Sequence, residues 1–258
     1  MDFSQEKQLD GGVVQRDFSV QVNGETVPGV VWSKADAPPA SVLICMGHGG
    51  SQHKKVVGIR NRALQYAKKH GWATLAIDAP AHGDRISREE AAAMRREVGA
   101  RVTGQSNAPA FSEERLRMML RRSQQAVPEW QAALDTCLDF DFIQADAAVG
   151  YWGVSMGTAI GVPFVSVDPR IRCAVLGLAG LRPGATEFEA AAKKITIPIQ
   201  FVFQWADAVA PQDHGIALFD AFGSKEKTMH INPGGHLGIP AFESDAWLAF
   251  YERHLLAS

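Results

Sequence analysis

The chain has 258 residues, of which 46% are hydrophobic and 21% are charged, and its formal net charge is −2. This length and apolar content fit one compact globular domain and exclude a disordered, collagen-like or low-complexity chain. The near-neutral charge gives no reason to expect a nucleic-acid partner or a membrane-surface partner.

Predicted strands and helices alternate along most of the chain. Residues 13–32 are more polar and contain Asn23-Gly24, which predicts an antiparallel hairpin on the sheet edge. Short apolar runs predict buried strands at 42–46, 73–77, 147–152, 173–178 and 199–203, and a last strand is predicted at 227–231. One-sided apolar patterns predict helices from about residue 59 to a stop at Gly71, over 127–138 and over 247–255. The alternation indicates a parallel sheet with helices on both faces.

Residues 85–122 interrupt this alternation and are rich in arginine. Their apolar residues predict two short amphipathic helices, around 91–94 and 116–120, with a loop at 104–109 between them. Insertions of this length in compact folds are usually functional, so we predict a helical lid within a single domain of residues 1–258. The alternative is a solvated helical excursion without a role.

The first residues lack the apolar core of a secretory signal, and no segment approaches the roughly 20 apolar residues of a membrane span. Cys45, Cys137 and Cys173 lie inside apolar runs, which is typical of reduced core residues. No histidine pair has the spacing of a zinc site, so no metal is expected. Together these features indicate a cytoplasmic protein.

The strongest chemical signal is Gly153-Val154-Ser155-Met156-Gly157, a G-x-S-x-G motif between a predicted strand and a predicted helix. In this context the motif is typical of a nucleophile on a strained strand-to-helix turn. The two glycines leave room for the turn to approach its neighbours, and the turn exposes the hydroxyl above the sheet. We predict Ser155 as the nucleophile; the alternative is a tight structural turn.

A serine nucleophile needs a base, and the base needs an orienting acid. In this architecture the acid and then the histidine follow the serine, on loops after later strands. Asp207 is the first carboxylate after the predicted strand 199–203, and His236 lies in the glycine-rich loop after the last strand. Asp213 competes with Asp207, but it follows Pro211 and is expected to cap the next helix.

Acyl transfer also needs hydrogen-bond donors for the developing oxyanion. One predicted donor is the backbone amide of Met156. The second is expected in the loop Gly47-His48-Gly49-Gly50, whose register is ambiguous: one alignment uses the amide of Gly49 or Gly50, the other that of His48.

Gly50 and His82 are further candidates for contact with the substrate. His82 precedes the serine and so breaks the required chain order, and its alternative role is to fix a loop beside the site. His230 is expected to be packed or hydrogen-bonded within the last strand.

The chain resembles the α/β-hydrolase family, in particular its dienelactone-hydrolase-like and esterase-like members. The resemblance extends from Val42 to the C-terminus and rests on Gly47-His48-Gly49-Gly50, Asp78-Ala79-Pro80-Ala81-His82-Gly83, Gly153-Val154-Ser155-Met156-Gly157, Asp207-Ala208-Val209-Ala210-Pro211 and Gly235-His236. It implies hydrolysis without a cofactor through a covalent acyl-enzyme, with Ser155 as nucleophile, His236 as base and Asp207 as its partner. Dienelactone hydrolases proper use a cysteine nucleophile, so Ser155 argues against that activity.

The favoured function is hydrolysis of a small or medium carboxylic ester. A thioesterase, an amidase or a carbon–carbon bond hydrolase would use the same triad, and a non-catalytic ligand-binding protein would keep the fold. The insertion arginines suggest an ester that bears a carboxylate, such as a monoester of an aromatic diacid. Alternatively, they pair with nearby glutamates: Glu89, Glu90, Glu97, Glu113 and Glu114. Three aromatic residues are candidates for a homodimer surface or for core positions: Trp205, Phe219 and Phe222.

Overall fold

The computed structural model describes residues 3–103 and 113–256 and contains a nine-stranded sheet with the order β1-β2-β3-β5-β4-β6-β7-β8-β9. The strands are β1 (Gln5–Leu9), β2 (Val13–Val22), β3 (Glu25–Lys34), β4 (Ala40–Gly47), β5 (Ala73–Ile77), β6 (Ile143–Val154), β7 (Ile171–Gly177), β8 (Ile199–Gln204) and β9 (Lys227–Asn232). Strands β4 to β9 pair in parallel, whereas β1, β2 and β3 are antiparallel, and β3 joins β5 in antiparallel pairing. The predicted parallel sheet is therefore confirmed, and each predicted buried strand corresponds to one of β4 to β9.

The N-terminal hairpin is confirmed, but its predicted place at the sheet edge is wrong. Strands β2 and β3 pair across Asn23 and Gly24, whose φ values of 52° and 82° suit the tight turns that join twisted strands. Strand β1 pairs with the outer side of β2 and forms the edge. Its residues, Gln-Glu-Lys-Gln-Leu, are almost fully exposed and show no apolar alternation, so no pattern indicates a strand there.

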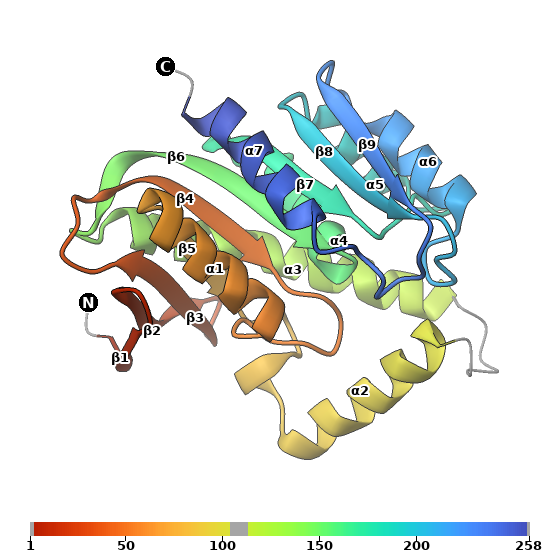
Figure 1. Cartoon of the computed structure of the whole chain (residues 1–258). Coiled ribbons are helices and arrows are strands. Elements are labelled where there is room, and N and C mark those ends of the chain that lie inside the picture. Colours follow the sequence, from red (N-terminus) through yellow and green to blue (C-terminus); the bar gives the residue numbers. More distant parts are fainter. Residues whose placement is uncertain (1–2, 104–112, 257–258) are drawn as a thin grey trace.

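All helices of the described ranges except α2 form two layers around the sheet (Figure 1). The helices are α1 (Val57–His70), α2 (Arg88–Val102), α3 (Glu113–Leu138), α4 (Met156–Val165), α5 (Thr186–Lys194), α6 (Gln212–Ala221) and α7 (Glu243–Leu255), with a short 3₁₀ turn at Gly83–Arg85. Helices α1 and α7 bury apolar residues against one face of the sheet, and α3, α4, α5 and α6 cover the other face. As predicted, α1 ends at Gly71, which has φ 70° and donates its N–H to the Ala67 carbonyl.

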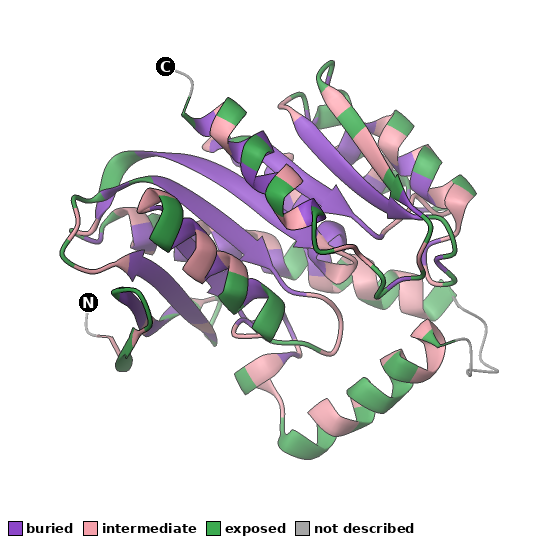
Figure 2. Cartoon of the chain, viewed as in Figure 1, coloured by how far each residue is buried: buried purple, intermediate pink, exposed green. Residues whose placement is uncertain are grey.

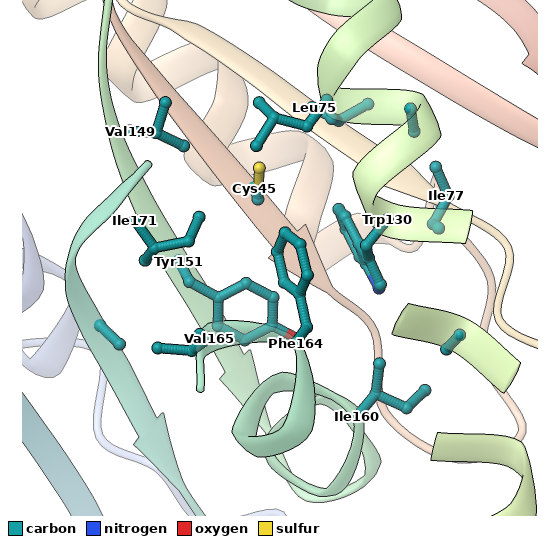
Figure 3. Packing of buried hydrophobic residues seen from close by; sticks show 14 of the residues in the cluster. Cys45, Leu75, Ile77, Trp130, Val149, Tyr151, Ile160, Phe164, Val165 and Ile171 are labelled. Carbon is teal, nitrogen blue, oxygen red and sulfur yellow. The ribbon is translucent and has the colours of Figure 1, made fainter. Parts of the chain in front are cut away.

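The two layers enclose the apolar core, which appears as a continuous buried sheet between half-exposed helices in Figure 2. Figure 3 shows the core beneath α4, where Trp130, Tyr151 and Phe164 contact one another with ring centroids 5.7–5.9 Å apart. Cys45 lies in the same cluster, and all three cysteines are buried and free, as predicted. None of the helices in the described ranges is both long and apolar enough to cross a membrane.

The second helix of the insertion is much longer than predicted. Instead of a short helix near residues 116–120 and a separate one over 127–138, the chain forms a single 26-residue helix, α3. Leu116 and Leu120 pack against the core cluster that contains Trp130 and Leu134, so one apolar stripe continues along the helix. The predicted loop at 104–109 lies outside the described residues.

Helix α2 differs from the other helices because it buries none of its residues. It projects away from the sheet layers in Figure 1 and is exposed or half-exposed along its length in Figure 2. Its start is well defined: Ser87 and Glu90 form a reciprocal capping box. Few buried contacts therefore hold α2 to the rest of the fold, and its role as a lid stays a prediction.

Two buried ion pairs anchor the segment that leads from β5 to α2. Lys54 Nζ lies 2.6 Å from Asp78 Oδ2, and both side chains are almost inaccessible to solvent. Arg85 makes a two-pronged contact with Glu129 of α3, at 2.8 and 2.9 Å. Because an unpaired buried charge is costly, these pairs fix the loop in one position.

We expect Lys54→Met to lower the free energy of unfolding by about 3 kcal/mol, because it leaves the Asp78 carboxylate buried without its cation. Urea unfolding measures this loss. Lys225→Met, at an exposed position, is the control and should change stability by less than about 0.5 kcal/mol. A loss below about 1 kcal/mol for Lys54→Met would contradict the assignment.

Candidate functional site

The predicted nucleophile lies at the junction between β6 and α4, at the carboxyl edge of the parallel strands. Ser155 has φ 58° and ψ −118°, a conformation that is unfavourable for a residue with a side chain. Its N–H donates to the Gly177 carbonyl at 2.9 Å, which holds the turn against β7. The strained turn that the motif predicts is thus present.

The glycines of the motif are required by close backbone contacts. A Cβ at Gly157 would lie 2.5 Å from the Gly47 carbonyl oxygen, and a Cβ at Gly153 would lie 2.7 Å from the Gly157 oxygen. Tyr151, within β6, supports the turn from below by donating its hydroxyl to the Gly157 carbonyl at 2.7 Å. Any larger residue at the two glycines would displace Ser155.

The structure brings Ser155, His236 and Asp207 into one hydrogen-bonded row. The Ser155 hydroxyl lies 2.9 Å from His236 Nε2, and His236 Nδ1 lies 2.7 Å from Asp207 Oδ2. The other Asp207 oxygen accepts the backbone N–H groups of Val209 and Ala210 at 2.8 and 3.0 Å. Asp207 and His236 are both buried, so the carboxylate and the imidazole have fixed orientations.

Asp213, the alternative acid, makes no contact with His236. It lies in the first turn of α6 and its side chain is 79% exposed. The expectation that it caps this helix is wrong: the cap position is Pro211, which provides no side-chain hydrogen bond. An acidic residue in the first turn nevertheless favours the helix dipole.

The loop after β4 places two candidate oxyanion donors in different environments. The Gly49 N–H donates to Gln52 Oε1 at 3.1 Å, whereas no described residue accepts the His48 N–H. Met156 is the first residue of α4, so its N–H also has no partner within the helix. Sequence reasoning missed Gln52, because nothing in the pattern indicates which amide its side chain reaches.

The His48 side chain holds this loop in place through two hydrogen bonds. Its Nδ1–H donates to the Gly49 carbonyl at 2.9 Å, and its Nε2 accepts the Ala79 N–H at 3.1 Å. These partners require the neutral imidazole. Burial lowers the pKa of His48 to about 4, and it also lowers the pKa of the neighbouring His82.

A cavity of about 690 Å³ opens beside the Ser155–His236 pair. Its walls come from the loop after β4, including Gly50, from the first turns of α1, from one side of α2 and from the loop after β9. Gly50 therefore lines the cavity beside Ser155, and its contact with a substrate stays a prediction. His82 instead lines a smaller neighbouring cavity, and its Nδ1–H donates to the Pro80 carbonyl at 3.0 Å, which fits its alternative role in fixing the loop.

Several arginines of the insertion pair with acidic residues. Arg101 and Arg115 both contact Glu97, and Arg117 contacts Glu113. Arg95 and Arg101 also line the large cavity. In the described parts of the chain, no group of three or more His, Cys, Asp and Glu side chains is arranged to hold a metal ion.

The sheet order, the strained serine turn and the late acid and histidine loops define an α/β-hydrolase fold. A cold-adapted esterase from an Arctic intertidal metagenomic library, solved with bound PEG, is 31% identical; the match covers 99% of this chain and 100% of that one, with a TM-score of 0.76. The native structure of a cold-adapted esterase from such a library matches with 29% identity over 99% and 100% of the two chains and a TM-score of 0.71.

The chain therefore belongs to the esterase-like α/β-hydrolases. An acetyl xylan esterase from Paenibacillus sp. R4 has the same fold, with a TM-score of 0.72, 16% identity and coverage of 99% of this chain and 90% of that one. The two cold-adapted esterase structures support the esterase part of the resemblance. No family model matches the chain, and no curated protein matches it.

The lowered pKa values of His48 and His82 predict that stability falls with acidification. In the unfolded chain both histidines bind a proton near pH 6.5, whereas in the folded protein His48 stays neutral down to about pH 4. The unfolded state thus binds more protons in this window, and the free energy of unfolding decreases as pH falls from about 7 to 4. Each histidine contributes a slope of at most about 1.4 kcal/mol per pH unit.

Urea unfolding at several pH values tests this expectation. His48→Asn should make the dependence between pH 4.5 and 6.5 shallower by up to one proton, whereas His53→Asn, at an exposed histidine, should leave it unchanged. Equal slopes for wild type and His48→Asn would show that His48 is not held neutral.

Proposed function

We propose that this protein is a serine hydrolase that cleaves small or medium carboxylic esters through an acyl-enzyme intermediate. The observation that supports this most directly is the row in which His236 lies between the Ser155 hydroxyl and the Asp207 carboxylate. Membership of the esterase-like α/β-hydrolases favours an ester bond as the one that is cleaved.

In the first half of the reaction, Ser155 Oγ attacks the ester carbonyl carbon and its proton passes to His236 Nε2. Asp207 accepts the Nδ1–H of His236, which keeps Nε2 unprotonated before attack and stabilises the imidazolium afterwards. The tetrahedral intermediate then collapses, the C–O bond to the alcohol breaks, and His236 donates the proton to the leaving oxygen.

In the second half, water attacks the acyl-enzyme while His236 Nε2 accepts one of its protons. The second tetrahedral intermediate releases the carboxylic acid, and the proton returns from His236 to Ser155 Oγ. All proton transfers therefore use one nitrogen, and no cofactor takes part in the scheme.

For the oxyanion, the hydrogen-bond pattern supports the amides of Met156 and His48. The Gly49 amide is already bound to Gln52, so the register that uses His48 leaves both donors available. Gly49 then contributes its flexibility and its contact with Gln52 rather than its N–H. Such preorganised donors stabilise the transition state without reorganisation.

Helix α2 acts as the lid in this proposal. One side of the helix forms part of the wall of the large cavity, while none of its residues is buried in the core. A cavity of about 690 Å³ suits a small or medium ester. Arg95 on this wall supports an ester that bears a carboxylate, whereas Arg101 on the same wall is paired with Glu97.

We expect Ser155→Ala to lower the hydrolysis of p-nitrophenyl acetate and butyrate by about four orders of magnitude, because the acyl-enzyme can no longer form. A serine-directed organophosphonate should add once to the wild type, as followed by intact mass, and not to Ser155→Ala. Ser166→Ala, at the C-terminal end of α4, is the matched control and should retain activity.

A second pair of variants tests the acid. Asp207→Asn should reduce kcat by several orders of magnitude, because the amide cannot hold the required imidazole tautomer. Asp213→Asn should have little effect on kcat, because the Asp213 side chain is exposed and makes no hydrogen bond with His236. Absence of both turnover and adduct in the wild type would favour a non-catalytic ligand-binding protein.

A further inference from the structure

Arg62 stands out among the residues that line the large cavity. It lies in the second turn of α1, and its guanidinium contacts the indole of Trp152, with Cζ 4.0 Å from the ring centroid, and that of Trp247 at 4.8 Å. Arg62 and Trp152 line the same cavity as Ser155 and His236. The cluster of Arg62, Trp152 and Trp247 is called the Arg62 cluster below.

The Arg62 cluster contains three buried N–H donors without an acceptor: Arg62 Nε, Trp152 Nε1 and Trp247 Nε1. The two indoles contact each other edge to face, with centroids 5.4 Å apart. Because buried polar groups are almost always hydrogen-bonded, three unmatched donors on side chains that contact one another require an explanation. Of the three side chains, Arg62 and Trp152 line the cavity, and both carry donors without any acceptor, which suits an anion.

The charge of Arg62 is also uncompensated. Its single hydrogen bond within the described residues runs from Nη1 to the Gly58 carbonyl at 2.7 Å, and no carboxylate pairs with it. Every Asp and Glu except Asp2 lies in the described ranges, so the chain offers Arg62 no other acidic side chain there. Burial lowers the pKa of Arg62, as expected for a cation that lacks a counterion.

The chemistry of a guanidinium narrows the class of ligand. When one face rests on an aromatic ring, the N–H groups remain available at the edge and match the two oxygens of a carboxylate. The neighbouring wall of the cavity is apolar, with Val56, Ile59 and Ile239. A ligand that fits both features has a hydrocarbon or aromatic body that ends in a carboxylate.

We propose that the Arg62 cluster is a carboxylate-binding subsite, which selects esters whose acid or alcohol part carries a free carboxylate. The selection of substrate rests on the proposed esterase function, but anion binding by the cluster does not. Arg62 differs in this respect from Arg101 of the lid, which is already paired with Glu97. Arg62 is thus a specificity-determining residue, and the reacting atoms belong to Ser155 and His236.

The kinetic test compares charged esters with uncharged isosteres. One pair, 4-acetoxybenzoate and 4-acetoxybenzamide, places the carboxylate on the alcohol side; the other, monomethyl adipate and its primary amide, places it on the acyl side. For at least one pair, the wild type should prefer the carboxylate. Arg62→Gln should reduce kcat/KM for that carboxylate by about 10- to 100-fold, mostly through KM, and leave its amide isostere within about twofold.

Three further variants make the kinetic result specific. Arg60→Gln removes an exposed arginine from the same helix and should not change the preference. Arg62→Lys keeps the charge without the two-pronged geometry, so its preference for the carboxylate ester should be intermediate. If Arg62→Gln does not fold, Arg62→Lys still tests the proposal. Arg95→Gln tests the lid: if it abolishes the preference while Arg62→Gln does not, the proposal is wrong.

Measuring anion binding directly tests the carboxylate subsite independently of ester hydrolysis. Adipate and 4-hydroxybenzoate are titrated into Ser155→Ala, with calorimetry and tryptophan fluorescence as readouts, since Trp152 and Trp247 lie in the cluster. At least one of the two anions should bind, and the added Arg62→Gln substitution should weaken that binding about 10-fold or more. Binding that depends on Arg62 without any ester hydrolysis would support the subsite and overturn the esterase. Ester hydrolysis with no carboxylate preference, or with anion binding unchanged in Arg62→Gln, would overturn the subsite alone.

Discussion

Strand β4 and helix α4 meet at one backbone contact, Gly47 against Gly157, and the geometry of the site depends on it. A Cβ at Gly157 would come within 2.5 Å of the Gly47 oxygen, so neither segment can carry a side chain at this contact or move closer to the other. The contact brings the loop that begins at His48 next to the start of α4, where Ser155 and Met156 lie. It thereby joins the predicted oxyanion loop to the nucleophile turn through rigid backbone rather than through mobile side chains.

The contact is supported from the core. Tyr151 donates its hydroxyl to the Gly157 carbonyl, and Tyr251 of α7 donates to the Tyr151 carbonyl at 2.6 Å. The two faces of the sheet thus both contribute to the position of the serine turn. Because Tyr151 packs against Trp130 and Phe164, a change in core volume there would be transmitted to Ser155.

Much of the fold could be predicted because parallel strands buried on both faces have continuous apolar sequences, as in β4, β5 and β8. Strand β1 could not, since its exposed residues pair with β2 through backbone hydrogen bonds and the surface ion pair of Glu6 with Arg16, and neither leaves an apolar pattern. The extent of α3 was missed because its first half is charged and its apolar stripe there is thin. The sequence therefore predicts a strand or helix well where its residues are fully buried. It predicts poorly where backbone pairing and a surface ion pair form a strand, as in β1, or where a thin apolar stripe sets the length of a helix, as in α3.

The candidate site shows the same division. Ser155, Asp207 and His236 follow from motif context and chain order, and they lie together in the fold. The oxyanion register could not be read, because it depends on where the Gln52 side chain reaches. The Arg62 cluster could not be read either, since a single arginine in an amphipathic helix becomes unusual only when two tryptophans from other elements contact it.

Helix α2 has a consequence for how this protein can diversify. Residues in the core are constrained by the shape of their neighbours, so most changes there reduce stability. Helix α2 buries nothing, yet one side of it forms part of the cavity wall. Substitutions on that side can therefore alter the size and charge of the cavity at almost no cost to folding. Substitutions that change the substrate can therefore occur in α2, while the core residues that stabilise the sheet stay the same.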